Sequence, residues 1–67
     1  MTLKQLRTGL GLTQKQMGEA LGIEKQTYAD LERGRYIPSG SRLIHICETF
    51  MVTATVYGDG RIEYKAK

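Results

Sequence analysis

The sequence has little of the chemistry on which enzymes, disulfide-stabilised proteins and metalloproteins depend. Its single cysteine, Cys47, excludes an internal disulfide and supplies no metal site, which fits a reducing cytosol. The one histidine, His45, has no Cys, His or carboxylate partner at ligand spacing. No nucleophile can be matched with a base, and Gly58-Asp59-Gly60 has the chemistry of a turn. We therefore expect no enzyme activity, no metal and no cofactor.

Long apolar runs are also missing. No stretch approaches the roughly 18 residues of a membrane helix, and the start of the chain lacks the apolar segment of a secretion signal. A chain of 67 residues is near the lower limit for one stable core, so a deep substrate cavity or a second domain is not expected. We predict a single small, soluble, intracellular module with no membrane partner and no evident small-molecule ligand.

Acidic residues are absent from two segments of the chain. Ten Lys and Arg outnumber seven Asp and Glu, giving a net charge of +3, and residues 1–18 and 33–47 contain bases but no acid. The intervening residues 19–32 contain four acids and one base, Lys25. A positive balance suits a nucleic-acid partner without requiring one. The charge pattern is therefore two basic segments around an acidic one.

Apolar residues at helical spacing predict two short helices in the first third of the chain. Leucines at positions 3, 6 and 10 form a stripe behind a Thr2 cap. Thr13 and Gln16 form the capping box of a second helix, over 13–21. Gly18 inside that helix costs roughly 1 kcal/mol relative to Ala. It indicates either the close approach of another helix backbone or a tolerated weak position.

Two further helices follow a tight turn at Gly22 and Ile23. The third is predicted over residues 25–33, ended by Gly34, with Tyr28 and Leu31 facing inward. Pro38 and Ser39 precede the fourth. Its apolar residues recur at the spacing of a complete core stripe: Leu43, Ile46, Cys47, Phe50 and Met51. Cys47 is expected to pack in this stripe as a small hydrophobic residue.

The end of the chain changes to a period of two, which predicts a β-hairpin around residues 58–60. A three-residue loop with Gly60 in the left-handed position sorts apolar from polar side chains, whereas a two-residue turn mixes them. This register pairs Val56 with Ile62, Ala54 with Tyr64, Thr55 with Glu63 and Thr53 with Lys65. An isolated hairpin is marginal in water, so its apolar face covers the helices of its own chain or meets a second subunit.

The helices on either side of the Gly22 turn carry the functional signal. Two short helices joined by a Gly-containing turn have the form of a helix-turn-helix. Residues 6–39 resemble the phage repressor and Cro helix-turn-helix family, also called the XRE-like family. The matching elements are Leu12-Thr13-Gln14, Leu21-Gly22-Ile23, Leu31-Glu32 with Gly34, and Pro38-Ser39. The C-terminal hairpin resembles, more loosely, the end of a Cro protein.

This resemblance implies a mainly α (α+β) fold of the lambda-repressor type. Residues 1–51 would form a four-helix helix-turn-helix domain, and residues 52–67 a hairpin in the same domain that serves dimerisation. The implied function is that of a Cro-like phage or prophage repressor in a bacterial cytoplasm, binding a palindromic operator of double-stranded DNA as a homodimer. An antitoxin of a toxin-antitoxin pair, or a protein-binding anti-repressor, remains open. The lack of a long disordered tail favours the repressor over the antitoxin.

The resemblance also assigns DNA contacts. Base edges would be met by Gln26 on adenine, Lys25 on guanine and Asp30 on cytosine, with Thr27 and Ala29 beside them. Gln14 is expected to brace Gln26 as well as to contact phosphate. The expected phosphate contacts are Gln14, Lys15, Arg33, Arg35, Tyr36, Ser39 and Lys4, and Arg42 either joins them or is solvated. The expected dimer surface comprises Ile44, Met51, Val52, Ala54, Val56, Ile62 and Tyr64.

Three residues have expected roles that differ from their neighbours. Glu24 either caps the third helix, contacts cytosine or repels DNA of the wrong sequence. Glu32 is expected to point into the domain toward Arg7, because the family pairs the acid before the closing glycine with a base near the first helix. Tyr36 either donates its hydroxyl to a phosphate or packs its ring under the loop.

Overall fold

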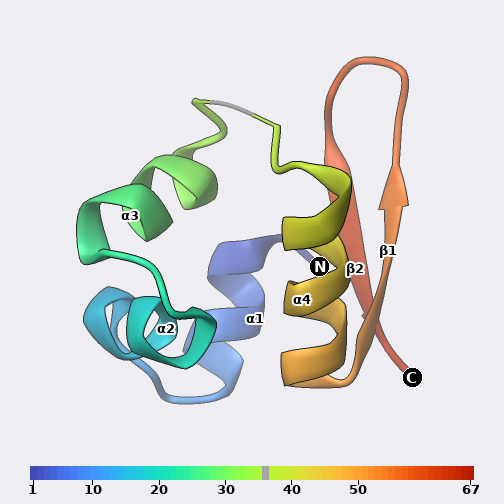
Figure 1. The fold of residues 1–67 in the computed structure, drawn as a ribbon. Coiled ribbons are helices and arrows are strands. Elements are labelled where there is room, and N and C mark those ends of the chain that lie inside the picture. The colour runs from blue at the N-terminus through green and yellow to red at the C-terminus, as the bar shows by residue number, and fades with distance from the viewer. Residues whose placement is uncertain (36) are drawn as a thin grey trace.

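The computed structural model describes residues 1–35 and 37–67 and shows four helices followed by a two-stranded antiparallel sheet (Figure 1). The elements are α1 (Leu3–Gly9), α2 (Gln14–Leu21), α3 (Lys25–Arg33), α4 (Gly40–Phe50), β1 (Val52–Val56) and β2 (Ile62–Ala66). In Figure 1, α2 and α3 lie on one side, the hairpin lies on the other, and α1 and α4 lie between them. The predicted fold of four helices and a C-terminal hairpin is confirmed. Within the described residues, no helix has the length and apolar character needed to cross a membrane.

Threonine and serine start three of the helices. Thr13 and Gln16 form the predicted capping box of α2, and Thr2 forms a second box with Gln5, a pairing that was not predicted. Ser39 caps α4 by accepting from the backbone N–H of residue 42. Glu24 occupies the N-cap position of α3, but its side chain makes no capping hydrogen bond within the described structure. The predicted capping role of Glu24 is therefore wrong, and its carboxylate is exposed.

The turn between α2 and α3 explains the glycine inside α2. The Ile23 N–H donates to the Gly18 carbonyl at 2.9 Å, which folds the turn back onto α2. A Cβ at position 18 would lie 2.9 Å from the Ile23 carbonyl oxygen, closer than real Cβ contacts allow. A backbone does approach Gly18 closely, but it belongs to the turn and to the N-cap residue of α3, so the predicted approach of another helix backbone is wrong. Gly22 ends α2 in the left-handed conformation, with φ of 70°.

One hydrophobic cluster joins the helices to the hairpin. From the helices it contains Leu3, Leu6, Met17, Leu21, Tyr28, Leu31 and Ile46, and from the hairpin Val52 and Tyr64. Val52 is 2 % exposed and Tyr64 is 3 % exposed. Their assignment to a dimer surface is therefore wrong, because the core of their own chain already buries them. The hairpin covers its own helices, which was one of the two predicted alternatives.

The hairpin has the predicted register. Val56 pairs with Ile62, Ala54 with Tyr64, Thr55 with Glu63 and Thr53 with Lys65. Gly60 has φ of 89°, the left-handed conformation that the three-residue loop requires. β2 also extends its hydrogen bonding to the start of the chain, because the Tyr64 N–H donates to the Met1 carbonyl at 2.8 Å.

The end of α4 departs from the predicted core stripe. Ile46 is fully buried, and Leu43, Cys47 and Phe50 pack half-buried against the core. Met51 is 66 % exposed, because α4 ends at this residue with φ of 56° and the chain turns away from the helical path. Met51 is therefore not a core residue.

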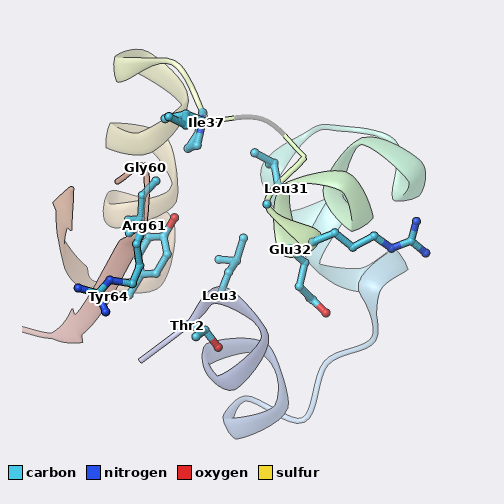
Figure 2. Close-up of a pocket in the computed structure, with 12 residues that line it drawn as sticks. Thr2, Leu3, Leu31, Glu32, Ile37, Gly60, Arg61 and Tyr64 are labelled. Atoms are coloured by element: carbon cyan, nitrogen blue, oxygen red, sulfur yellow. The ribbon is translucent and has the colours of Figure 1, made fainter. Parts of the chain in front are cut away.

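A cavity of about 230 Å³ lies where α1, α3 and β2 approach one another (Figure 2). Leu3, Leu31 and Tyr64 contribute to its walls from these three elements. At its rim the loop after α3 contacts the hairpin loop, and a Cβ at Gly60 would lie 3.4 Å from the Ile37 side chain.

Candidate nucleic-acid interface

The start of α3 presents polar side chains outward while its inner face enters the core. Tyr28 has no exposed surface and Leu31 is 8 % exposed. Lys25 and Gln26 are exposed on the first turn, and Thr27 and Asp30 are half-buried beside them. These four predicted base-contact residues reach the surface. The helix therefore has one apolar face and one polar face.

Ala29 does not share that surface. It is 5 % exposed. An alanine side chain extends only one carbon from the backbone, so at this burial its methyl group has no path to a base edge. The burial of Ala29 argues against its predicted base contact.

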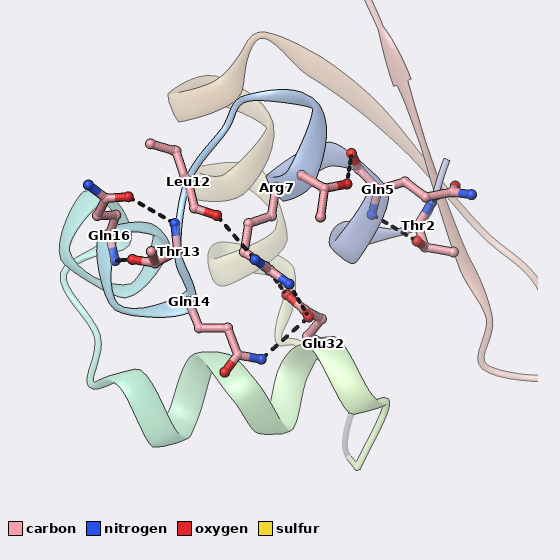
Figure 3. Close-up of polar contacts among 9 residues, drawn as sticks. Thr2, Gln5, Arg7, Leu12, Thr13, Gln14, Gln16 and Glu32 are labelled. Atoms are coloured by element: carbon pink, nitrogen blue, oxygen red, sulfur yellow. Dashed lines mark hydrogen bonds and ion pairs between the residues drawn. The ribbon is translucent and has the colours of Figure 1, made fainter.

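A partly buried polar network holds α3 against α1 and α2 (Figure 3). The Arg7 guanidinium donates to both oxygens of Glu32, with Nε to Oε2 at 2.9 Å and Nη2 to Oε1 at 3.2 Å. Arg7 also donates from Nη1 to the Leu12 carbonyl at 3.1 Å. The side chains of Arg7 and Glu32 are 16 % and 6 % exposed. The predicted inward pairing of Glu32 is confirmed, and its bidentate geometry fixes the orientation of both side chains.

Gln14 belongs to the same network. Its Nε2 donates to Glu32 Oε1 at 3.4 Å, which ties the first turn of α2 to the end of α3. The predicted brace between Gln14 and Gln26 is not what the structure shows, because the amide of Gln14 is directed to the Glu32 carboxylate instead. A charged acceptor attracts an amide N–H more strongly than another neutral amide does.

The surroundings of this network shift the pKa values of Glu32, Arg7 and the neighbouring Tyr28. Burial acts to raise the pKa of Glu32. Its hydrogen bonds act in the opposite direction, the one from Arg7 most strongly, and together they hold this pKa below its ordinary range. The hydrogen bond with Glu32 in turn raises the pKa of Arg7. Burial raises the pKa of Tyr28 well above its usual value, and this hydroxyl has no hydrogen-bond partner among the described residues. At neutral pH the network is thus a charged pair beside a neutral phenol.

Basic side chains lie at both ends of α3. At its N-terminal end, Lys25 lines an open hollow together with the first turn of α2, including Gln14 and Lys15. Arg33 and Arg35 are exposed at its C-terminal end. Because the N-terminal N–H groups of helices carry partial positive charge, the hollow is electropositive from its backbone as well as from its lysines. The geometry suits a polyanion that crosses both ends of the helix.

The other predicted phosphate contacts are placed less uniformly. Lys4 is exposed on α1 and does not line this hollow. Ser39 is exposed, but its hydroxyl oxygen is already the cap of α4. Tyr36 lies outside the described residues, so the structure does not bear on either role predicted for it.

On the outer face of α3, three residues that were predicted as separate DNA contacts form one cluster. Gln26 Nε2 donates to Asp30 Oδ1 at 3.2 Å, and Arg35 Nε lies 3.6 Å from the same oxygen. The spacing of four residues between Gln26 and Asp30 was a usable signal, since such positions are neighbours on a helix. The position of Arg35 was not, because it depends on the turn at Gly34.

An apolar surface lies on the other side of the molecule, on α4 and β1. Ile44, Met51 and Val56 are 60 %, 66 % and 53 % exposed. Ile44 also lines a shallow, mainly apolar groove with Cys47 and Ala54. Ala54 and Ile62 of the predicted dimer surface are half-buried against the core of their own chain.

Comparison with known proteins identifies the pattern. A family model described as Helix-turn-helix matches residues 3–56. The chain is 40 % identical over 48 residues to the "Uncharacterized HTH-type transcriptional regulator YgzD" of Bacillus subtilis (strain 168), covering 72 % of this chain and 73 % of that protein. It is 46 % identical over 37 residues to an "Uncharacterized HTH-type transcriptional regulator" of Methanothermobacter thermautotrophicus, covering 55 % and 54 %. No solved structure gives a significant match.

Proposed function

We propose, from the premise that this chain belongs to the helix-turn-helix family of DNA-binding transcriptional regulators, that it is a Cro-like repressor whose α3 enters the major groove of operator DNA. The observation that carries the proposal is the outward face of α3. Lys25 and Gln26 are exposed at its first turn, while the Arg7–Glu32 pair holds its last turn. A helix fits the major groove, and side chains near its start reach the base edges.

The division of labour follows from the side-chain chemistry. Gln26 would pair with adenine through its amide, and Lys25 would donate to guanine, with Thr27 beside them. The flanking groups would hold phosphates and supply most of the affinity: Lys4, Gln14, Lys15, Arg33, Arg35, Tyr36 and Ser39. Asp30 is half-buried between these two sets.

Two substitutions separate these roles. Gln26→Ala should lose one base preference, worth about 1 to 3 kcal/mol, and should leave binding to unrelated DNA unchanged. Arg35→Ala should weaken binding to all sequences alike and lower the salt slope by about one. Titrations of specific and unrelated duplexes at several salt concentrations measure both effects. Identical behaviour of the two variants would contradict the division.

We also propose that two copies bind together. One α3 spans only a few base pairs, whereas two related by a twofold axis, about 34 Å apart, would read successive faces of a palindromic site. The shallow, mainly apolar groove that Ile44 lines with Cys47 and Ala54 supports this proposal, since subunits cover apolar surface of this kind, and Met51 and Val56 are further exposed apolar residues. Ala54 and Ile62 would lie at its edge.

The dimer surface is tested by Ile44→Asp. Ile44 is 60 % exposed, so the charge should leave the fold intact while lowering the dimer fraction at least tenfold. Analytical ultracentrifugation measures the association, and a thermal melt of the variant checks its fold. Ile37→Asp is the matched control, because Ile37 is also 60 % exposed but lies in the loop after α3. Equal dimer fractions in the wild-type protein and Ile44→Asp would show that this surface is not used.

The function as a whole is tested by selecting bound sequences from random double-stranded DNA. We expect a palindrome whose half-sites are centred about 10 base pairs, or a multiple of that, apart. Absence of binding at about 50 mM salt would overturn the repressor proposal, because the electrostatic contribution is large at that concentration. A protein-binding anti-repressor would then be the better assignment.

A further inference from the structure

The hydrogen-bonded cluster on the outer face of α3 bears on how Gln26 selects a base. Gln26 Nε2 donates to Asp30 Oδ1 at 3.2 Å, and the two residues are one helical turn apart. Asp30 is itself held, since Arg35 Nε lies 3.6 Å from the same oxygen. The Asp30 side chain is 24 % exposed, and that of Arg35 is 66 % exposed. The acid is thus partly enclosed between two side chains and is not a freely solvated group.

The turn after α3 brings Arg35 to this position. Gly34 ends the helix in the left-handed conformation, with φ of 76°. The next N–H, of Arg35, then donates back to the Asp30 carbonyl at 3.0 Å. The chain therefore returns over the last turn of α3, and the Arg35 guanidinium lies beside the carboxylate of the residue that its own backbone contacts.

We infer that Asp30 is a positioning residue that makes Gln26 select adenine over guanine. The inference rests on the proposed function, because it requires α3 to lie in the major groove. Asp30 acts on the base through Gln26 and does not itself touch the base that Gln26 reads. This role differs from the cytosine contact that the sequence predicts for Asp30.

The chemistry of the two side chains carries the inference. An ionised carboxylate only accepts hydrogen bonds, so the amide of Gln26 must turn its NH₂ group toward Asp30. One N–H is then committed, and the amide carbonyl and the second N–H remain for the DNA. The Gln26 amide therefore presents one acceptor and one donor to the DNA, in an orientation that its hydrogen bond to Asp30 fixes.

The purines differ in what they offer this pair. In the major groove adenine presents the N6 donor and the N7 acceptor, which match one carbonyl and one N–H. Guanine presents two acceptors, O6 and N7, which an unconstrained glutamine amide meets by rotating its NH₂ group toward them. By holding that group, Asp30 removes the arrangement that guanine needs. Arg35 offsets the charge of Asp30, which limits the repulsion between this acid and the phosphates.

The test compares binding to operators that carry adenine or guanine at the position read by Gln26, identified as the position whose preference Gln26→Ala abolishes. We expect the wild-type protein to prefer adenine at least tenfold. Asp30→Asn is isosteric, but its amide either accepts or donates, so the Gln26 amide is free to reverse. The adenine-to-guanine ratio of Asp30→Asn should fall at least threefold below that of the wild-type protein. A smaller fall overturns the inference.

Two controls separate orientation from charge. Asp30→Glu keeps a group that only accepts and should retain the adenine preference. Glu19→Gln removes one negative charge from an exposed site on α2 and should change the affinity for all sequences without changing the ratio. If Asp30→Asn instead loses a preference for cytosine at another base pair and keeps the ratio, the acid contacts DNA directly and the inference fails.

A measurement without DNA keeps this inference distinct from the proposed function. In the free protein, the NMR signals of the Gln26 side-chain NH₂ should move in Asp30→Asn and stay in place in Glu19→Gln. Unchanged signals in Asp30→Asn overturn the inference even if DNA binding is as proposed. If the wild-type protein binds DNA with no base preference that depends on Gln26, the proposal that Gln26 reads a base is wrong, and the selection of adenine through Asp30 is wrong with it. The NMR result then still decides whether Asp30 orients the Gln26 amide in the free protein.

Discussion

The two sides of this small domain are held in different ways. The side formed by α2 and α3 contributes side chains to the common core and adds to that packing a bidentate ion pair, the Gln14 hydrogen bond and a close backbone approach at Gly18. The side formed by α4 and the hairpin depends on apolar packing around Val52 and Tyr64. Hydrogen bonds depend on the relative orientation of donor and acceptor, whereas the stabilisation from apolar contacts depends mainly on the surface area that is buried. The side with oriented polar side chains is suited to reading a pattern of donors and acceptors, and the other is suited to association.

The largest predicted effect is on the hairpin side. Tyr64→Ala should destabilise the domain by about 3 to 5 kcal/mol, because it removes a buried aromatic side chain from the only hydrophobic cluster found in the described residues. For a chain of this size such a loss approaches the whole free energy of unfolding. Chemical denaturation monitored by circular dichroism measures the change. Tyr57→Ala, at an exposed aromatic on the same hairpin, is the control and should change stability much less.

The next effect is on the polar side and depends on pH. Glu32→Ala should cost about 2 kcal/mol at neutral pH, because it leaves Arg7 without its carboxylate partner. The folded pKa of Glu32 lies below its ordinary value, so its contribution to stability is present above the unfolded pKa, near 4.3, and is lost as the pH falls through the lower folded pKa. The difference in unfolding free energy between the wild-type protein and Glu32→Ala should therefore shrink below about pH 4. A difference that stays constant from pH 7 to pH 3 would contradict the assignment.

The smallest effect distinguishes two helical glycines. Gly18→Ala should destabilise by about 1 kcal/mol, since its Cβ would lie 2.9 Å from the Ile23 carbonyl and the strain exceeds the gain in helix propensity. Gly9→Ala should stabilise by a few tenths of a kcal/mol, because nothing lies within 4 Å of the added carbon. Melting temperatures of the two variants compare the signs. If both substitutions stabilise, α2 and the turn are packed less tightly than the structure indicates.

The parts of the fold that were predictable depend on local chemistry. The box of Thr13 and Gln16, the end of α3 at Gly34 and the register set by Gly60 each follow from a few neighbouring residues. The pairing of Arg7 with Glu32, which lie 25 residues apart, followed only from the family resemblance, since no local pattern joins them. Family resemblance thus supplied the long-range contact that spacing alone did not.

The parts that were not predictable depend on how the elements pack. Apolar spacing assigned Met51 to the core, but the left-handed end of α4 exposes it. Sequence alternation grouped Val52 and Tyr64 with Val56, although the helices cover the first two and leave Val56 exposed. Ala29 lies among polar residues in the sequence, and only the packed structure shows that it is buried. The exposure of Lys25 and Gln26 at the start of α3 was predictable, whereas the position of Arg35 beside Asp30 was not, because it depends on the turn at Gly34.

The three bonds of Arg7 have a mechanical consequence. One guanidinium joins α1, the Leu12 carbonyl before α2, and Glu32 of α3, so it ties the last turn of α3 to the rest of the domain. In the proposed complex the helix would enter the groove at an angle set by the whole domain. Any mismatch between two half-sites would then be absorbed by bending or twisting of the DNA between them. The stiffness of base pairs that no side chain touches would thereby contribute to the choice of operator.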